Sequence, residues 1–500
     1  TMSWEDFLII AILMSSFLPG IAIFMLPEEN SAMRTGLNLF GAGLKMMLII
    51  IMDMAIYYGR VFEMRLELME GVEIFINADP LSALFATLSG VLWLLTTVYA
   101  VGYLEGSPNR SHFFGYFSIC VTVTTGIAMA GNLITFLLFY EMLTLATYPL
   151  IIHRGTAEAL KAGRSYLIYA FGGGGVFLFA VIWLHTLAGP ADFTPTGFAP
   201  DLLRNHAPEL RLIFLLLIAG VGVKAALVPL HGWLPQAMVA PAPVSALLHA
   251  VAVVKAGAFG ITRIVLDVYG VKNILQLNLL PWLMAVSTIT ILWGSLKAMQ
   301  QDGLKQRLAY STVSQISYIA LGISLANHPL ALIGGLVHLI HQGVMKITLF
   351  FCAGNLAETL GIHRISEMGG VGRRLPLTMA AFTVGALGMI GIPPTVGFVS
   401  KWYLCLGGIE ADNWLVVGVL ISSSLMNGIY FLPIINSAWF GEQGGPWPRE
   451  KKFGRLETHW MLLLPPLVTA VVVIAAGIVA NAQVSPLAWV KFVVEEYIRP

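Results

Sequence analysis

Charged side chains are scarce in this sequence. Among its 500 residues, Lys and Arg number 28 and Asp and Glu number 27, together 11% of the chain, whereas 57% of the residues are hydrophobic. Soluble globular domains carry about 25% charged residues, so the composition excludes an ordinary soluble domain and predicts a polytopic membrane protein. The net charge of +1 gives no basis for nucleic-acid binding.

Cysteines and cofactor-binding motifs are also nearly absent. Cys120, Cys352 and Cys405 stand singly in apolar segments, without a CxxC pair or the spacing of a zinc or iron–sulfur site, so we expect packing residues and no metal. No Walker motif occurs, no GxGxxG follows a strand pattern, and the glycines at 172–175 lie in a helical run, where they favour close packing. We therefore expect no cofactor and no autonomous catalytic site in this chain, and any redox or nucleotide chemistry must belong to another chain.

Apolar runs of about 20 residues, by contrast, recur from Phe7 to Ala480, and by this length criterion there are roughly 14 of them. Because lipid offers no hydrogen-bond partners to the backbone, such runs must form helices. The first run lacks a basic leader and an A-x-A-type cleavage site, so we expect a retained helix rather than a signal peptide.

Basic residues in the loops predict the orientation in the membrane. With the first helix starting near Phe7, the loops after odd-numbered helices contain Arg34, Arg110, Arg154, Lys161, Arg164, Lys297, Lys305, Arg307, Arg364, Arg373, Arg374, Arg449, Lys451, Lys452 and Arg455. The opposite side contains only Arg60, Arg65, Arg204, Arg211, Arg263 and Lys272. The positive-inside rule then places the odd loops in the cytoplasm and both termini outside.

A set of ionisable residues interrupts the apolar runs. They are Lys45, Asp53, Glu141, Lys224, His249, Lys255, His338, His341, Lys346 and Lys401. A charge at the bilayer centre costs about 3 kcal/mol on insertion scales, so such residues usually face a protein interior or a hydrated path. For any one of them the alternative is a structural ion pair or a side chain that reaches the membrane surface. So many in one chain favour a functional path.

Glu141 lies in FLLFYEMLTLATYPL, where Thr144 and Tyr148 share its helix face. We expect its partner to be a buried lysine. Because neighbouring charges decide whether such groups are ionised, moving the pair apart or together releases or captures a proton. The alternative is a static buried ion pair, which holds two helices together and moves nothing.

Two apolar segments place prolines beside a lysine. GVGVKAALVPLHGWLP has Lys224 ahead of Pro229, and GALGMIGIPPTVGFVSKWYLC has Pro393 and Pro394 ahead of Lys401. Broken membrane helices line hydrated cavities, where a lysine can exchange protons, and a pair of such segments is typical of inverted repeats in transporters. A simple proline kink is the alternative for either segment alone.

Two further groups of polar positions lie between and beyond these segments. His249 and Lys255 are separated by about 9 Å along an ideal helix, so they need water or a third group to connect them. His338, Gln342 and Lys346 fall on one helix face and form a polar stripe about 12 Å long. Such a stripe is typical of a proton relay in a membrane protein.

Lys45 and Asp53, in one apolar run, give a weaker signal. We expect them on a single helix face and favour a structural role for both. His249 likewise has the alternative of a satisfied interior histidine.

Several stretches together resemble a known family. They are KAALVPLHGWLPQAMVAPAPVSALLHAVAVVKAG, FYEMLTLATYPL, DGLKQRLAYSTVSQISYI, HLIHQGVMKITLF and GFVSKW. From about Asp79 to Lys401, the chain is similar to the antiporter-like, proton-conducting membrane subunits shared by NADH-quinone oxidoreductase, membrane-bound hydrogenases and Mrp cation/proton antiporters. The resemblance implies an all-α fold of about 14 transmembrane helices, with two inverted five-helix repeats and broken helices 7 and 12.

The resemblance also divides the chain into segments. Residues 1–110 form helices 1–3, residues 111–270 the first repeat with helices 4–8, and residues 271–440 the second repeat with helices 9–13. Residues 441–500 form a basic loop, helix 14 and the C-terminal tail.

Proton-transfer positions of the family are matched in this chain by Glu141, Lys224, His249, Lys255, His338, Lys346 and Lys401. In the family the glutamate stands on helix 5, three lysines stand on helices 7, 8 and 12, and the remaining positions lie on the connecting hydrophilic axis. Gln342 departs from the pattern, because a second histidine is common there. Since an amide does not titrate, we expect His341 or water to carry that step.

We therefore expect a proton-translocating subunit of a multisubunit membrane complex, and we favour a Mrp-type Na+/H+ antiporter subunit. The alternative is a proton-pumping membrane subunit of a redox-driven complex. A quinone-binding subunit is less well supported because no quinone pocket is marked, and a structural scaffold leaves the ionisable axis unexplained. The partners implied are other integral membrane subunits, with a redox arm in the second case, and the location implied is a prokaryotic plasma membrane.

Overall fold

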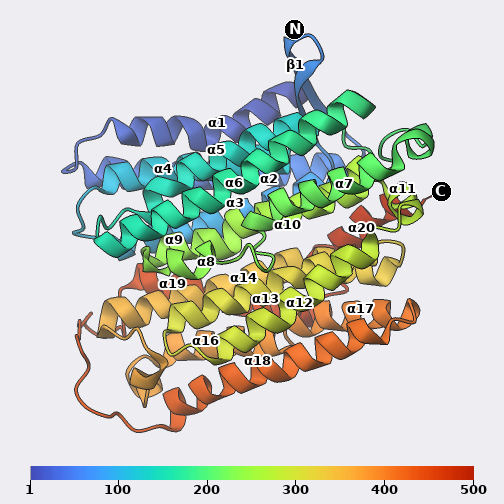
Figure 1. Ribbon diagram of the computed structural model, residues 1–500. Helices are drawn as coiled ribbons and strands as arrows, with labels where there is room; N and C mark the ends of the chain where they lie inside the picture. Colours follow the sequence, from blue (N-terminus) through green and yellow to red (C-terminus); the bar gives the residue numbers. More distant parts are fainter. Residues whose placement is uncertain (1, 500) are drawn as a thin grey trace.

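Long helices run side by side through the structure, a computed structural model that describes residues 2–499 (Figure 1). Eleven helical segments of the described chain are long and apolar enough to cross a bilayer. Ten of these are α1 (Trp4–Phe24), α2 (Ser31–Tyr57), α3 (Pro80–Tyr103), α5 (Leu133–Ile151), α6 (Ala157–Ala188), α7 (Asp201–Lys224), α12 (Leu280–Met299), α14 (Pro329–Leu360), α18 (Trp414–Phe440) and α19 (Trp460–Ile478). The chain is therefore a mainly helical, multi-pass membrane protein.

The eleventh segment, Ala242–Tyr269, is built from four pieces. They are α9 (Ala242–Ala246), the π-helix η2 (Leu247–Val251), α10 (Val253–Arg263) and the π-helix η3 (Ile264–Tyr269). This segment and α14 are the most deeply buried spans, at 100% and 94% of their apolar windows. They carry the three predicted histidines and two of the predicted lysines, Lys255 and Lys346, so these side chains face protein rather than lipid.

Three further units pack in the same bundle but are shorter or more polar. They are α4 (Arg110–Ala128), α13 (Leu304–Ile323) and the pair α16 (Pro376–Ile390) and α17 (Val396–Glu410). α4 packs between α1 and α5, and α13 packs between α12 and α14. Since length and hydropathy alone do not select these units, the predictions of about 14 spans and of inverted repeats stay predictions.

The helices break at both predicted places. α7 ends at Lys224, and the chain continues through a loop into α8 (Trp233–Gln236) and η1 (Ala237–Val239). The indole Nε1 of Trp233 donates to the Val223 carbonyl at 2.7 Å, and the Val228 amide donates to the hydroxyl of Thr290 at 3.1 Å. These bonds satisfy backbone groups that the break leaves without helical partners.

The second break separates α16 from α17. α16 ends at Ile390, and Gly391 follows with φ of +96°, a conformation that favours glycine. Pro393 and Pro394 then occupy the gap before α17 begins at Val396.

A β-hairpin lies outside the all-α prediction. β1 (Phe62–Met69) pairs antiparallel with β2 (Val72–Ala78), and Gly71 makes the turn with φ of +77°. Figure 1 shows the start of the chain, this hairpin, α11 (Val271–Gln276) and the C-terminal end at the same end of the bundle. The remaining elements are η4 (Ile365–Glu367), α15 (Val371–Arg374) and α20 (Pro486–Ile498).

Candidate functional site

Lys224 sits at the last residue of α7, where the helix breaks, and its side chain is buried. Its ammonium donates to the backbone carbonyl of Tyr140 and to the hydroxyl of Thr144 at 2.8 Å, both on α5. It also lies 3.6 Å from the centre of the Tyr140 ring. Lys224 is therefore held by neutral acceptors and a cation–π contact rather than by a carboxylate.

Glu141 follows Tyr140 on α5 but forms no ion pair with Lys224 in the described chain. Its Oε1 atom is buried without a hydrogen-bond partner among residues 2–499. The carboxylate packs against Gly174 of α6, where a Cβ would overlap it. The glycine run thus gives room to the carboxylate, and the predicted pair is present as two adjacent but separate groups.

Lys255 and His249 lie on opposite sides of an irregular turn. His249 belongs to η2, stacks on Phe350 with ring centres 4.3 Å apart, and has no hydrogen-bond partner on either ring nitrogen within residues 2–499. Lys255, on α10, donates to the Leu339 carbonyl at 2.8 Å and to the Gln342 side-chain oxygen. The structure therefore joins Lys255 directly to the stripe on α14, and within residues 2–499 no hydrogen bond joins it to His249.

The stripe on α14 is buried along its length. His338 Nε2 lies 2.9 Å from Gln315 Oε1, and Lys346 donates to the Ser311 hydroxyl at 2.7 Å, so both reach α13. His341, one position before Gln342, turns to the other side and lies 2.8 Å from the Ser400 hydroxyl on α17.

Lys401 follows Ser400 on α17 and reaches back across the break. Its ammonium donates to the carbonyls of Met389 and Ile390, both at 2.9 Å, and to the Ser424 hydroxyl at 2.8 Å. The two carbonyls belong to the last turn of α16, so the lysine satisfies backbone acceptors that the broken helix exposes.

Four polar residues outside the predicted set complete the contacts around α14. Gln315 and Ser311 on α13 meet Asn427 and Tyr430 on α18 through hydrogen bonds of 3.3 Å from Gln315 to Asn427 and 3.2 Å between Ser311 and Tyr430. All four are fully or almost fully buried. Their helical spacing, at i and i+4 on α13 and at i and i+3 on α18, is the signal that a search of the sequence for polar stripes detects.

Lys45 and Asp53 on α2 bind different neighbouring helices. Lys45 donates to the Ile12 carbonyl and the Ser16 hydroxyl on α1, both at 3.0 Å. Asp53 accepts a hydrogen bond from Thr87 on α3.

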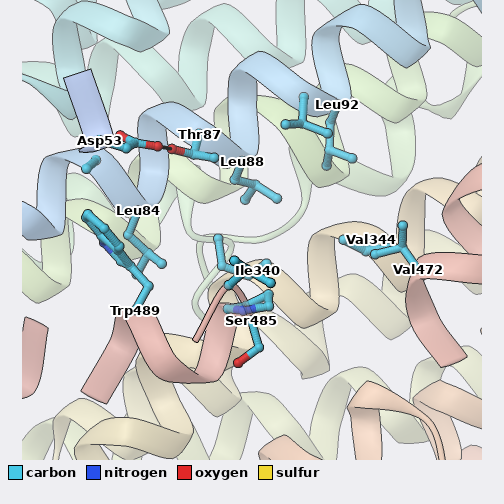
Figure 2. A pocket seen from close by; sticks show the side chains of 14 residues that line it. Asp53, Leu84, Thr87, Leu88, Leu92, Ile340, Val344, Val472, Ser485 and Trp489 are labelled. Atoms are coloured by element: carbon cyan, nitrogen blue, oxygen red, sulfur yellow. Dashed lines mark hydrogen bonds between the residues drawn. The ribbon is translucent and has the colours of Figure 1, made fainter. Parts of the chain in front are cut away.

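Asp53 also borders a cavity of about 290 Å³ between α2, α3, α14, α19 and α20. Figure 2 shows Asp53 and Thr87 on one wall and Trp489 of α20 on another. The other lining side chains are mostly apolar, including Leu84 and Val344. Neither Lys45 nor Asp53 contacts the residues that surround α14 through a hydrogen bond in the described chain.

The arrangement offers a discontinuous series of proton-accepting and proton-donating groups through the buried centre of the bundle. Unpartnered buried atoms mark the gaps in it, and in residues 2–499 they include Glu141 Oε1, both nitrogens of His249, His338 Nδ1 and Gln342 Nε2. Buried polar atoms of this kind are usually satisfied by ordered water. No group of three or more His, Cys, Asp or Glu side chains within residues 2–499 is arranged to hold a metal ion.

This fold and this buried axis define a class of membrane subunit, and the sequence identifies the family. Residues 130–427 match the family described as NADH:quinone oxidoreductase/Mrp antiporter, TM. A relative from Desulforudis audaxviator, named NADH-quinone oxidoreductase subunit N, is 36% identical over 84% of this chain and 85% of its own length. The chain belongs to the NADH:quinone oxidoreductase/Mrp antiporter transmembrane family.

Two further relatives are longer than this chain. Hydrogenase-4 component B of Escherichia coli is 31% identical over 67% of this chain, and Na(+)/H(+) antiporter subunit A1 of Staphylococcus haemolyticus is 29% identical over 82% of it. The matches cover 51% and 53% of those proteins, so this chain spans about half of their length.

Solved structures share the fold over the whole chain. A chain of the Mrp complex from Dietzia sp. DQ12-45-1b aligns over 100% of both chains with a TM-score of 0.85 at 21% identity. A chain of the archaeal membrane-bound sulfane sulfur reductase covers 99% of this chain and 98% of its own, with a TM-score of 0.84 at 23% identity. The prediction of a helical, polytopic membrane fold of this family is confirmed.

Proposed function

We propose that this chain carries protons across a membrane as one subunit of a multisubunit complex. The proton-transfer groups are Glu141, Lys224, His249, Lys255, His338, His341, Lys346 and Lys401. The observation that carries the proposal is the kind of hydrogen-bond partner that the four buried lysines of this set have. Each is bound by backbone carbonyls, hydroxyls or a side-chain amide, and none forms an ion pair within residues 2–499.

A buried ammonium without a carboxylate partner is costly, and a lysine that only fastens helices together needs a counter-ion. An amine that gains and loses a proton during turnover instead needs acceptors that bind it in both states, and hydroxyls and amides do this. The contacts therefore support proton transfer over the static ion pair.

The test is transport by the complete complex in sealed vesicles. Lys224→Ala and Glu141→Ala should abolish proton movement while the complex keeps its full set of subunits. Wild-type transport in either variant would contradict the proposal. Loss of assembly in both, with transport per assembled complex unchanged, would favour a scaffold.

Two kinds of complex are compatible with this proposal. The antiporter relatives and the Mrp structure support a subunit of a Na+/H+ antiporter, which we favour. The subunit N relative, which is matched over most of its length, supports a redox-driven proton pump. Mass spectrometry of the purified complex separates them, because a redox pump brings partners with flavin or iron–sulfur motifs and an antiporter brings only membrane subunits.

We also propose that both termini lie on the outer side of a prokaryotic plasma membrane. The loops at the opposite end of the bundle contain most of the basic residues, as the positive-inside rule requires of the cytoplasmic side. A membrane-impermeant thiol reagent applied to intact cells should label Val484→Cys, at a position that is 95% exposed, and should spare Gly444→Cys in the opposite loop. The reverse pattern would invert the topology.

A further inference from the structure

A chain of hydrogen bonds runs from α18 through α13 to His338 on α14. The Asn427 side-chain amide nitrogen donates to the Ser423 carbonyl at 2.6 Å. The Gln315 amide nitrogen donates to Asn427 Oδ1 at 3.3 Å, and Gln315 Oε1 lies 2.9 Å from His338 Nε2. All of these side chains are buried away from bulk solvent.

The donor and acceptor of each hydrogen bond in this series follow from the bond between Asn427 and the Ser423 carbonyl. A backbone carbonyl only accepts hydrogen bonds, so the side of Asn427 that faces the Ser423 carbonyl must be its NH2 group. Asn427 therefore presents its oxygen to Gln315, and the hydroxyl of Tyr430, 2.7 Å from that oxygen, donates to it as well. Gln315 must in turn point its NH2 group at Asn427 and its oxygen at His338.

An oxygen that faces the imidazole ring forces the ring nitrogen to be the donor. His338 Nε2 therefore carries a hydrogen whether the imidazole is neutral or charged, and Nδ1 is the atom that gains or loses a proton. Nδ1 is buried and has no protein hydrogen-bond partner among residues 2–499, so it is open to a water molecule of the axis.

The ring itself is held against rotation. Tyr318 of α13 stacks on it, with ring centres 5.1 Å apart and planes inclined by 26°. The Tyr318 hydroxyl is anchored on the side chain of Ser423. The same turn of α18 thus supports both the plane of the imidazole and the chain of amides that contacts its edge.

We propose that Gln315 and Asn427 are positioning residues that keep the proton on Nε2 of His338, so that Nδ1 alone exchanges protons with the axis. This inference rests on the proposed function, in which His338 is a proton-transfer group. The exchanged proton arrives at Nδ1 from a neighbouring donor and leaves by the same atom, while the Nε2 hydrogen and the amide chain stay unchanged.

The experiment reads the tautomer directly. Solid-state NMR on the complete complex, labelled with ¹⁵N-histidine, gives the His338 signals as those missing from His338→Gln. In the neutral ring we expect a protonated Nε2 and a bare Nδ1. Gln315→Met removes both polar ends of the amide, and Asn427→Leu lets Gln315 turn around, so each should produce a mixture of both tautomers.

Two matched variants keep the proposal falsifiable. Gln315→Glu still offers an oxygen to Nε2 and should retain the wild-type tautomer. Ser423→Ala removes the hydroxyl that anchors Tyr318 but keeps the carbonyl that orients Asn427, so it should retain the wild-type tautomer. Gln315→Met and Asn427→Leu should slow transport by about tenfold or more, as loss of a correctly protonated relay group does.

A wild-type His338 with its proton on Nδ1, or an unchanged Nε2 proton in both Gln315→Met and Asn427→Leu, overturns the inference. Normal transport by His338→Gln removes His338 from the proposed proton path. Even then, a tautomer that shifts in Gln315→Met and Asn427→Leu but stays fixed in Ser423→Ala supports the positioning by the two amides.

Discussion

At the scale of single residues, hydroxyl groups take the place that carboxylates usually take beside a buried lysine. Thr144 binds Lys224, Ser311 binds Lys346 and Ser424 binds Lys401. A hydroxyl accepts from an ammonium and also donates to a neutral amine, so it remains a partner in both protonation states.

Replacing Thr144 should show what this hydroxyl contributes. Thr144→Val keeps the side-chain shape but leaves the Lys224 ammonium with one acceptor fewer, at a cost of about 1–3 kcal/mol for the charged form. We expect slower proton transport with normal assembly. Thr144→Ser keeps the hydroxyl and should transport nearly as the wild type does, and equal loss in both variants would contradict this reasoning.

The glycine run on α6 gives a second prediction at this scale. Gly174→Ala places a methyl group where the Glu141 carboxylate lies, so the carboxylate must move and transport should fall. Gly175→Ala is the matched control, because no atom lies within 4 Å of the position of its Cβ. Vesicle transport measured for both variants decides, and an active Gly174→Ala would show that the carboxylate position is not critical.

At the scale of the elements, Trp233 closes the broken end of α7. Trp233→Phe removes the indole donor from the Val223 carbonyl, which keeps the Ala226 amide at 3.1 Å, and should destabilise the chain by about 0.5–1.5 kcal/mol. Trp93→Phe is a strict comparison, because Trp93 is also buried but its Nε1 has no hydrogen-bond partner in residues 2–499. Thermal unfolding of the purified complex should show a lower midpoint for the first variant than for the second.

The elements also show how far the sequence predicts the structure. The spans and both breaks follow from run length and from proline, because these depend on local chemistry that the sequence displays directly. The strand β1 is mostly exposed and alternates charged with apolar residues, so a search for long apolar runs does not find the hairpin at 62–78.

The residues of the candidate site likewise differ in how well the sequence predicts them. The histidines and lysines are predicted because an ionisable residue in an apolar run is conspicuous. Their partners Gln315 and Asn427 give only weak polar stripes on their own helices, and that these two side chains meet is not visible in the sequence. Lys224 likewise turns from Glu141 to Tyr140 and Thr144 for geometric reasons that spacing along the chain does not contain.

At the scale of the whole molecule, one buried arginine ties distant segments together at the end of the bundle that holds both termini. Arg263, the last residue of α10, binds Asp79 and Asp267, both at 2.7 Å. Asp79 in turn caps the start of α3. The Tyr497 hydroxyl, near the end of α20, donates to Asp267 at 2.9 Å. The C-terminal helix is thus fastened to the core through a charged cluster.

Tyr497→Phe should loosen this attachment. Losing the hydrogen bond to Asp267 leaves a buried carboxylate less well satisfied, so we expect faster amide hydrogen exchange over residues 486–498 with little change elsewhere. Tyr57→Phe is the control, because Tyr57 contacts α20 only through its ring, 5.6 Å from that of Phe492. Unchanged exchange in Tyr497→Phe would show that the other contacts of α20, including the hydrogen bond from Trp489 to the Pro80 carbonyl at 3.0 Å, are sufficient to hold it.

The contacts of Lys401 carry a stoichiometric consequence. An ammonium has three hydrogens, and Lys401 uses them on three oxygens, of which two belong to the last turn of α16 and one to Ser424 on α18. A neutral amine has only two hydrogens, so each proton that departs must set one of these oxygens free or turn the Ser424 hydroxyl into the donor. Loss of charge at Lys401 therefore either opens a bond to the end of α16 or reverses the bond to Ser424.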